Sequence, residues 1–398
     1  MSTPTSRGTL TDHGASLAIA VVCLPGLGGS GVVAAELALG LAARGHRVHV
    51  VATEIPERLA AHPGAITFER VDVPVSPVFE HAPYDVAVAG TLVELIRRTP
   101  IDLVHLHYAV PHAASALLVT RMLGARAPAM VMTLHGTDVT RFGGHPSLAA
   151  VTAFAVAACD GITAPSSYLR TAAAERFAIA AERIEVIGNF VDLERFAAPD
   201  VRDPDTMAAL FADRTPGPIL FHVSNFRPIK RPLDLVEVLA RVRRTLPARA
   251  VLVGDGPERA AVARRADELG VRDAVCLLGR RDDFARLLGH ADGFVLPSES
   301  EGFGVAALEA MAAGVPVFGY AVGGLPEVVA DGAGTLVPCC DVDALAAAVV
   351  AAIGDPARRD AMGRAARARA VDRFGDRAAI ARYEAYFRRV LARRASPL

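Results

Sequence analysis

Residues 17–44, LAIAVVCLPGLGGSGVVAAELALGLAAR, decide the fold of the first half of the chain. A short apolar, β-branched run leads through a glycine-rich turn into a helical stretch from about Val32, which is the unit that builds parallel sheets. The same order returns at residues 218–225, PILFHVSN, followed by a helical stretch that starts at Pro232. A strand–turn–helix unit at the start of each half predicts two sheets of the same kind.

Further β-rich runs alternate with helical stretches after each of these units. In the first half they are RVHVVAT, IDLVHLHY, AMVMTLHG and GITAPS, and in the second half ARAVLVGDG, AVCLLGR, GFVLPS and VPVFGY. Because strands that alternate with helices pair in parallel, we expect an α/β protein of two Rossmann-like, doubly wound domains with a cleft between them. The length of 398 residues is also too great for one ordinary core.

The boundary between the halves is expected at residue 199, in a stretch rich in Asp and Pro that lacks helical or strand periodicity. Near the end of the chain, Tyr383, Phe387 and Leu391 form an apolar stripe at helical spacing. The sequence therefore predicts an N-terminal domain of residues 1–198, a C-terminal domain of residues 199–375 and a final helix of residues 376–398 that packs back toward the first domain.

Composition and charge exclude several classes of protein. Lys plus Arg number 42 against 43 for Asp plus Glu, so the net charge of -1 lacks the basic excess of a nucleic-acid-binding protein. The five cysteines form no C-x-x-C pair, which fits a reducing cytoplasm better than a disulfide framework or a zinc site. No apolar stretch approaches the roughly 20 residues that span a membrane. We expect a cytoplasmic protein without nucleic acid or membrane span, and a homodimer is left open.

The loop of residues 26–31, GLGGSG, matches the G-x-G-x-x-G pattern where a strand enters a helix. Glycines let the backbone approach a ligand, and free amides at a helix start attract negative charge. Glu54 follows the second strand near the distance expected of a ribose-binding acid, so an oxidoreductase that uses NAD(P) or a flavin stays open. A tight turn without a ligand is a third interpretation.

Residues 298–309, SESEGFGVAALE, run from a buried strand through a glycine turn into a helix. Amides at the helix start near Gly304 can bind a pyrophosphate. Glu301 in the turn and Glu309 in the helix can accept hydrogen bonds from sugar hydroxyls. This stretch therefore suits a nucleotide sugar that is bound both at its pyrophosphate and at its sugar hydroxyls.

The basic residues Arg227, Lys230 and Arg231 follow the first strand of the same half, at the sheet edge where α/β proteins bind ligands. Without a metal, such cations would stabilise a leaving diphosphate as its charge grows. No Asp-x-Asp or His–carboxylate cluster accompanies them, so we expect no metal and no other cofactor. A solvated basic helix start is the plain alternative.

These motifs resemble glycosyltransferase family 4, whose members have the two-domain GT-B fold. The resemblance covers nearly the whole chain and rests on E-x7-E at Glu301 and Glu309, GDGPE at residues 254–258 and GGLPEVV at residues 323–329. It implies a retaining hexosyltransferase that depends on a UDP-sugar. In such an enzyme Glu301 binds the donor sugar, Glu309 binds the ribose, and an Arg–Lys pair binds the diphosphate.

The family pattern is broken at residues 224–226, where Ser-Asn-Phe replaces the usual Gly-Arg-Leu, so the arginine role is expected to shift to Arg227. The resemblance places His135 beside the donor sugar, with no protein nucleophile next to it. Retention is then expected without a covalent intermediate, the leaving phosphate taking the acceptor's proton. The expected catalytic residues are Glu301, His135, Arg227 and Lys230. The expected donor-binding residues are Arg227, Lys230, Arg280, Glu301, Gly302, Phe303, Gly304 and Glu309.

The first half resembles one subgroup of the family, whose members transfer N-acetylglucosamine from UDP-N-acetylglucosamine to L-malate in bacillithiol biosynthesis. The matching segments are GGSGVVAAEL from Gly28, HLHYAVPHA, TLHGTDVT and GNFVDLERF. A small dianion needs amides, hydroxyls and positive charge. The expected acceptor-binding residues are Gly28, Gly29, Ser30, Gly31, Tyr108, Thr137 and Arg141. Another small or lipid acceptor stays open, as does a sugar-binding module without activity.

Overall fold

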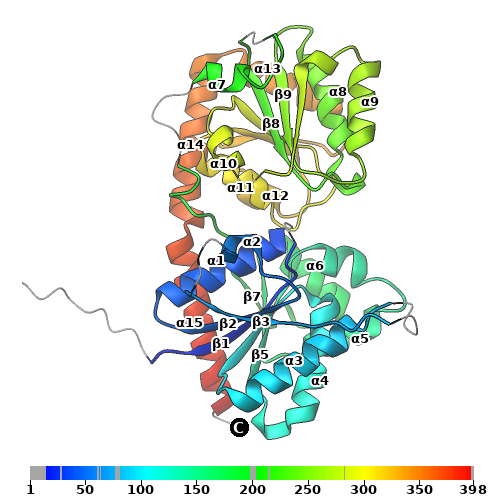
Figure 1. Cartoon of the computed structure of the whole chain (residues 1–398). Coiled ribbons are helices and arrows are strands. Elements are labelled where there is room, and N and C mark those ends of the chain that lie inside the picture. The colour runs from blue at the N-terminus through cyan, green and yellow to red at the C-terminus, as the bar shows by residue number, and fades with distance from the viewer. Residues whose placement is uncertain are drawn as a thin grey trace, which may run out of the picture.

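The structure is a computed structural model that describes residues 15–26, 29–60, 62, 64–76, 81–197, 203–213, 216–281 and 283–395. Two sheets, each flanked by helices, lie one above the other in Figure 1. All of their strand pairs are parallel. The predicted α/β architecture of two doubly wound parallel sheets is therefore confirmed.

Seven strands form the first sheet in the order β3-β2-β1-β4-β5-β6-β7. They are β1 (Ala18–Val22), β2 (Arg47–Ala52), β3 (Thr67–Arg70), β4 (Leu103–His107), β5 (Ala129–Thr133), β6 (Gly161–Ala164) and β7 (Ile184–Val186). Strand β1 pairs with both β2 and β4, so the strand order reverses at β1. The loops after β1 and β4 thus leave the sheet at its switch point, where α/β proteins bind ligands.

Six strands form the second sheet in the order β10-β9-β8-β11-β12-β13. They are β8 (Ile219–Val223), β9 (Arg249–Val253), β10 (Val275–Gly279), β11 (Gly293–Leu296), β12 (Val317–Tyr320) and β13 (Gly334–Val337). Here the order reverses between β8 and β11. The loop after β8 carries Lys230 and the loop after β11 carries Glu301, so both predicted donor-side segments leave this second switch point.

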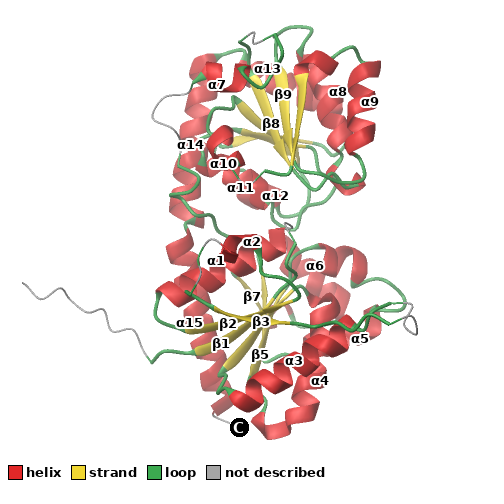
Figure 2. Ribbon diagram, in the orientation of Figure 1, coloured by secondary structure: helices red, strands yellow, loops and turns green. Residues whose placement is uncertain are grey.

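Alternating burial along the strands explains why helices lie on both faces of the first sheet (Figure 2). In β1, Ile19 and Val21 pack with α1 and the last helix, whereas Ala20 and Val22 pack with α3 and α4. The helices of this domain are α1 (Gly29–Ala43), α2 (Glu57–Ala60), α3 (Tyr84–Arg98), α4 (Ala109–Leu123), α5 (Ala149–Ala157) and α6 (Ser167–Phe177). Those of the second domain are α7 (Pro204–Ala208), α8 (Pro232–Val242), α9 (Arg259–Glu268), α10 (Phe284–Leu288), α11 (Val305–Ala312), α12 (Leu325–Val328) and α13 (Val342–Ile353).

The last two helices lie beside different domains. They are α14 (Pro356–Phe374) and α15 (Asp376–Ala395). In Figure 1, α14 runs along the second domain and α15 along the first. Tyr383 and Phe387 of α15 are fully buried against the first sheet, and the Tyr386 hydroxyl accepts a hydrogen bond from the Ile162 backbone at 2.8 Å.

The chain crosses between the two domains twice at one place. Val191 forms an isolated parallel bridge with Gly375, the residue between the last two helices. Val191 and Phe196 pack in the core of the second sheet, together with residues of α11 and α14. The boundary expected at residue 199 lies outside the described residues.

Candidate functional site

Asp138 is a buried carboxylate that fixes two strand-end loops of the first domain. It accepts hydrogen bonds from the backbone amides of Ala109 after β4, at 2.9 Å, and of His135 and Gly136 after β5, at 3.1 and 2.7 Å. Burial raises its pKa, and these amides oppose that shift. Sequence reasoning missed Asp138 although it stands within TLHGTDVT, because a carboxylate that binds backbone amides has no distinctive spacing.

His135 is half-buried and lies beside the buried His107 and His112. Its Nε2 lies 3.0 Å from Nδ1 of His107, and the backbone carbonyl of His107 accepts a hydrogen bond from His112 at 2.6 Å. Burial lowers the pKa of His135 to about 3 and that of His112 to about 4. These rings are therefore neutral at pH 7, and His135 offers an uncharged imidazole.

Tyr108 and Thr137 are brought together by the same two loops, and their hydroxyl groups are hydrogen bonded. Burial raises the pKa of Tyr108, while the positive charges of Arg227 and Arg141 lower it. Arg227 belongs to the second domain, so Tyr108 lies where cations of both domains act on it. Electrostatic and hydrogen-bond interactions thus link four residues that were predicted from the sequence: Tyr108, Thr137, Arg141 and Arg227.

The glycine loop places the start of α1 against the second domain. Gly29, Ser30 and Gly31 form the first turn of α1, which begins three residues before the start predicted from the sequence. A Cβ on Gly31 would lie 2.6 Å from a backbone carbonyl oxygen of the loop, so only glycine fits. A Cβ on Gly29 would touch Val305 at 3.7 Å, so the first turns of α1 and α11 adjoin. Gly28 lies outside the described residues.

Lys230 and Glu301 form an ion pair at the switch point of the second sheet, with Nζ 2.6 Å from Oε1. Glu301 is buried, and Lys230 is partly exposed. Lys230 is also the one lysine among the 42 Lys and Arg residues of the chain. Its ammonium group is a compact point charge, unlike the planar guanidinium of the arginines.

The Glu301–Gly302 turn contacts the first domain directly. The Ser166 hydroxyl donates a hydrogen bond to the Gly302 carbonyl at 2.7 Å, and the Gly324 amide donates to the Glu301 carbonyl at 2.9 Å. A Cβ on Gly302 would lie 2.6 Å from the carbonyl oxygen of His135. The turn that carries Glu301 is therefore held against the loop that carries His135.

Glu309 lies apart from this ion pair, in α11, and is 8% exposed. Its cationic neighbour is Arg58 of α2 at 3.9 Å, and Arg58 also lies 3.4 Å from Glu36 of α1. Burial raises the pKa of Glu309 to about 7; Arg58 lowers it and Glu36 adds to the rise. Glu309 is therefore poised to change charge near neutral pH, and Arg58 is a residue that sequence reasoning missed.

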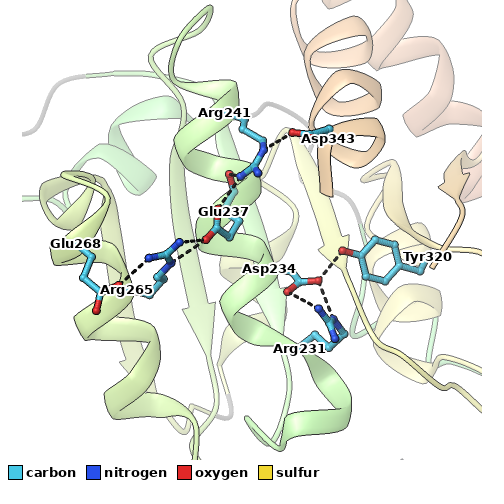
Figure 3. Close-up of polar contacts among 8 residues, drawn as sticks. All are labelled: Arg231, Asp234, Glu237, Arg241, Arg265, Glu268, Tyr320 and Asp343. Carbon is cyan, nitrogen blue, oxygen red and sulfur yellow. Dashed lines mark hydrogen bonds and ion pairs between the residues drawn. The ribbon is translucent and has the colours of Figure 1, made fainter. Parts of the chain in front are cut away.

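Arg231 is bound within its own domain. Its guanidinium donates two hydrogen bonds to Asp234, at 2.8 and 3.1 Å, and the Tyr320 hydroxyl donates to the same carboxylate at 2.6 Å (Figure 3). These bonds hold Arg231 to the first turn of α8. Of the three basic residues after β8, Arg227 is exposed and Lys230 faces Glu301.

The remaining donor-side residues occupy different positions. Gly304 has a φ of 101° and starts α11. The Phe303 side chain is 4% exposed, and its ring packs edge-on against that of Phe374 with the ring centroids 5.6 Å apart, so the ring lies in the core. Arg280 is exposed after β10, the edge strand, which β9 separates from β8.

The described residues contain neither a candidate metal site nor a helix that could span a membrane. No group of three or more of their His, Cys, Asp and Glu side chains is arranged to hold a metal ion. None of the helices in this part of the chain is long and apolar enough to cross a membrane.

Comparison with known proteins decides the family. The profile "Glycosyltransferase Family 4" matches residues 27–195, and "Glycosyl transferases group 1" matches residues 210–369. The N-acetyl-alpha-D-glucosaminyl L-malate synthase of Bacillus anthracis is 37% identical over 376 residues, which cover 94% of this chain and 97% of that protein. The chain belongs to glycosyltransferase family 4. This membership confirms the resemblance and decides against the oxidoreductase alternative.

Other relatives of this glycosyltransferase show how the fold is shared. The D-inositol 3-phosphate glycosyltransferase of Mycobacterium marinum is 38% identical over 176 residues, 42% of this chain and 36% of that protein. The structure of Anabaena HepE in complex with UDP and glucose has a TM-score of 0.77 at 21% identity, covering 93% of this chain and 99% of that chain. Sucrose-phosphate synthase from Thermosynechococcus elongatus has a TM-score of 0.75 at 23% identity, covering 96% and 100%. These two structures confirm the GT-B fold.

Proposed function

We propose that this glycosyltransferase transfers N-acetylglucosamine from UDP-N-acetylglucosamine to the hydroxyl group of L-malate, with retention of the anomeric configuration. The observation that carries the proposal is the 37% identity with the malate synthase over almost the full length of both chains. The site is consistent with it, because the turn that carries Glu301 lies against the loop that carries His135 in the first domain.

The donor occupies the second switch point in this proposal. Lys230, Arg227 and the amides at the start of α11 bind the diphosphate. When the diphosphate takes Glu301's place beside Lys230, the Glu301 carboxylate becomes free to accept hydrogen bonds from the hexose. Glu309 accepts hydrogen bonds from the ribose hydroxyls, and these bonds are strongest when its carboxylate is ionised.

The acceptor occupies the loops of the first domain. The hydroxyls of Ser30, Tyr108 and Thr137 and the amides of the first turn of α1 bind the malate carboxylates, with Arg141 supplying charge. The second domain reaches this cluster through Arg227, which acts electrostatically on Tyr108. Malate would thus lie between the first domain's hydroxyls and the donor's diphosphate.

The chemistry needs no protein nucleophile. The bond from C1 of the sugar to the β-phosphate oxygen breaks, and a bond from C1 to the malate hydroxyl oxygen forms on the same face. The hydroxyl proton passes to an oxygen of the leaving UDP, while Lys230 and Arg227 stabilise the growing charge. His135 is neutral and so orients the hexose by hydrogen bonding without adding charge.

One reaction tests the proposal. Purified protein is incubated with UDP-N-acetylglucosamine and L-malate in EDTA, and UDP release is followed together with the mass and anomeric configuration of the product. We expect an α-linked N-acetylglucosaminyl malate. UDP release only with inositol phosphate or a lipid acceptor would refute malate but leave the donor site standing. Activity that appears only when magnesium or manganese is restored would refute metal independence.

A further inference from the structure

Cys339 and Cys340 form a pair of adjacent, exposed thiols just after β13. Their sulfur atoms lie 3.2 Å apart, within the range of an S–H···S hydrogen bond. Both side chains are exposed, whereas Cys23 and Cys159 are buried and Cys276 is half-buried. The pair therefore combines proximity with access to solvent, which the other cysteines lack.

The backbone holds this pair in place. Cys340 has a φ of 66°, in the left-handed region, which costs a residue with a side chain about 1 to 2 kcal/mol. The next residue, Asp341, caps α13 by accepting a hydrogen bond from the Ala344 amide at 2.9 Å. The unfavourable turn is thus fixed by a 12-residue helix that begins directly after it.

Burial and a nearby positive charge act on Cys339 in opposite directions. Partial burial first, and the contact with Cys340 second, raise the pKa of Cys339 to about 11, while the positive charge of Arg231 opposes the shift. Either sulfur can be the donor in the contact between the two. Arg231 is itself oriented by Asp234, so the cation beside the thiols is fixed (Figure 3).

We propose that Cys339 and Cys340 form a dithiol site that small organic disulfides modify reversibly. One cysteine of the pair, as its thiolate, attacks one sulfur of the disulfide, forms a mixed disulfide and releases one thiol. The other cysteine then loses its proton to water and displaces the second thiol, leaving a Cys339–Cys340 disulfide. Two cysteine thiols are oxidised, and one organic disulfide is reduced to two thiols.

The proximity of the residues in sequence makes this modification reversible. Adjacent Cα atoms are about 3.8 Å apart, whereas disulfides usually join Cα atoms about 4.4 to 6.8 Å apart. A bond across adjacent residues is therefore strained, and strained, exposed disulfides are the readily reduced ones. The site suits reversible modification rather than structural cross-linking.

Mass spectrometry of the full chain tests the proposal. Reduced protein is treated with bis(2-hydroxyethyl) disulfide, and peptide mapping locates the product. We expect a loss of two hydrogen atoms confined to Cys339 and Cys340, reversed by dithiothreitol. Cys339→Ser and Cys340→Ser should each stop at a mixed disulfide on the remaining cysteine of the pair, and the control Cys276→Ser should match the unchanged protein.

A second probe reports the pair independently of oxidation. Phenylarsine oxide binds two neighbouring thiols at one arsenic and releases water, so the unchanged chain should retain one arsenic and each single serine variant none. Unchanged thermal unfolding of the variants would show that they fold. Oxidation that maps elsewhere, or arsenic bound equally by both serine variants, would overturn the proposal. These readouts do not use catalytic activity, so their outcome is independent of the proposed function.

Discussion

The two domains share one sheet topology but present opposite kinds of surface at their switch points. In the first domain, the neutral rings of His107 and His135 are hydrogen bonded to each other, and the buried Asp138 accepts hydrogen bonds from backbone amides. In the second domain, Lys230 and Glu301 form an ion pair beside the exposed Arg227. The first surface is fixed by internal hydrogen bonds, whereas the second is held by charges that a charged ligand can separate. Changes to charges in the second domain should therefore affect catalysis most, and changes in the first domain should affect the acceptor.

The largest effect is expected from Lys230→Ala. Loss of the cation that stabilises the leaving diphosphate should lower kcat by about 10²- to 10³-fold, with a smaller change in UDP affinity, because the partner gains charge in the transition state. Lys230→Arg should recover only part of the activity. Steady-state kinetics and UDP titration measure both, and Arg264→Ala, on the exposed surface of α9, is the control. Equal, small effects on kcat and UDP affinity would remove Lys230 from the site.

The single lysine also permits a direct test of where the diphosphate binds. An amine-reactive ester can label only Lys230 and the N-terminal amine of this chain. UDP should slow the labelling of Lys230 and leave the N-terminal amine unaffected, because the diphosphate covers the ε-amino group. Equal labelling of Lys230 with and without saturating UDP would place the diphosphate elsewhere.

Glu309→Gln should give the next largest effect and a change of pH dependence. A charge-assisted hydrogen bond is worth about 1.5 to 3 kcal/mol, so UDP affinity at pH 8 should fall about 10- to 150-fold. In the unchanged protein, UDP affinity should rise as the pH increases through 7, because the ionised carboxylate is the stronger acceptor. Calorimetry at several pH values should find this dependence lost in the variant.

Ionisation of Glu309 should lower the stability of the folded protein, whereas it should raise the affinity for UDP. Its folded pKa of about 7 lies above the ordinary value of 4.5, so its contribution to stability is full below pH 4.5 and is lost as the pH rises through 7. Glu309→Gln should therefore unfold at a temperature no lower than that of the unchanged protein at pH 8. Arg58 and Glu36, the charges that act on Glu309, are unchanged in the variant, so a difference in unfolding temperature is due to residue 309 itself. A variant with unchanged UDP affinity at every pH would contradict the ribose role.

The contacts among charged residues of the second domain could be predicted from the sequence more directly than the buried contacts of the first domain. Charged motifs such as Glu301 and Lys230 are readable because residue type states their chemistry, and the switch point of a parallel sheet brings them together. Asp138 and Arg58 were not found, because their roles depend on burial and on neighbours that are distant in sequence. The early start of α1 was missed for a similar reason, since a glycine that a close carbonyl requires looks like a loop residue.

Asp138→Asn tests whether buried hydrogen bonds fix the acceptor loops. An amide in place of the carboxylate would put an N–H donor against backbone N–H groups that now donate to Asp138. This should lower the free energy of unfolding by about 1 to 3 kcal/mol. The KM for malate should rise about tenfold, with UDP affinity unchanged. The control is Asp102→Asn. Asp102 accepts a hydrogen bond of 2.8 Å from the backbone amide of Ala18 in the same sheet, but it lies at the opposite end of the strands from Asp138. Equal effects of both variants on the malate KM would show that Asp138 acts only on stability.

The smallest effect is expected from single hydroxyls of the acceptor cluster. Thr137→Ala removes a neutral hydrogen bond worth about 0.5 to 1.5 kcal/mol, so the KM for malate should rise about two- to twelvefold while kcat changes little. Ser30→Ala should behave in the same way, because Ser30 lies in the first turn of α1 that adjoins α11. Thr140→Ala is the matched control, since the Thr140 hydroxyl donates to the Gly136 carbonyl within its own turn. If Ser30→Ala and Thr137→Ala both leave the malate KM unchanged while product still forms, the acceptor binds at a different part of the first domain. The contrast between a first domain fixed by internal hydrogen bonds and a second domain held by a separable ion pair would then rest on Asp138 and Lys230 alone.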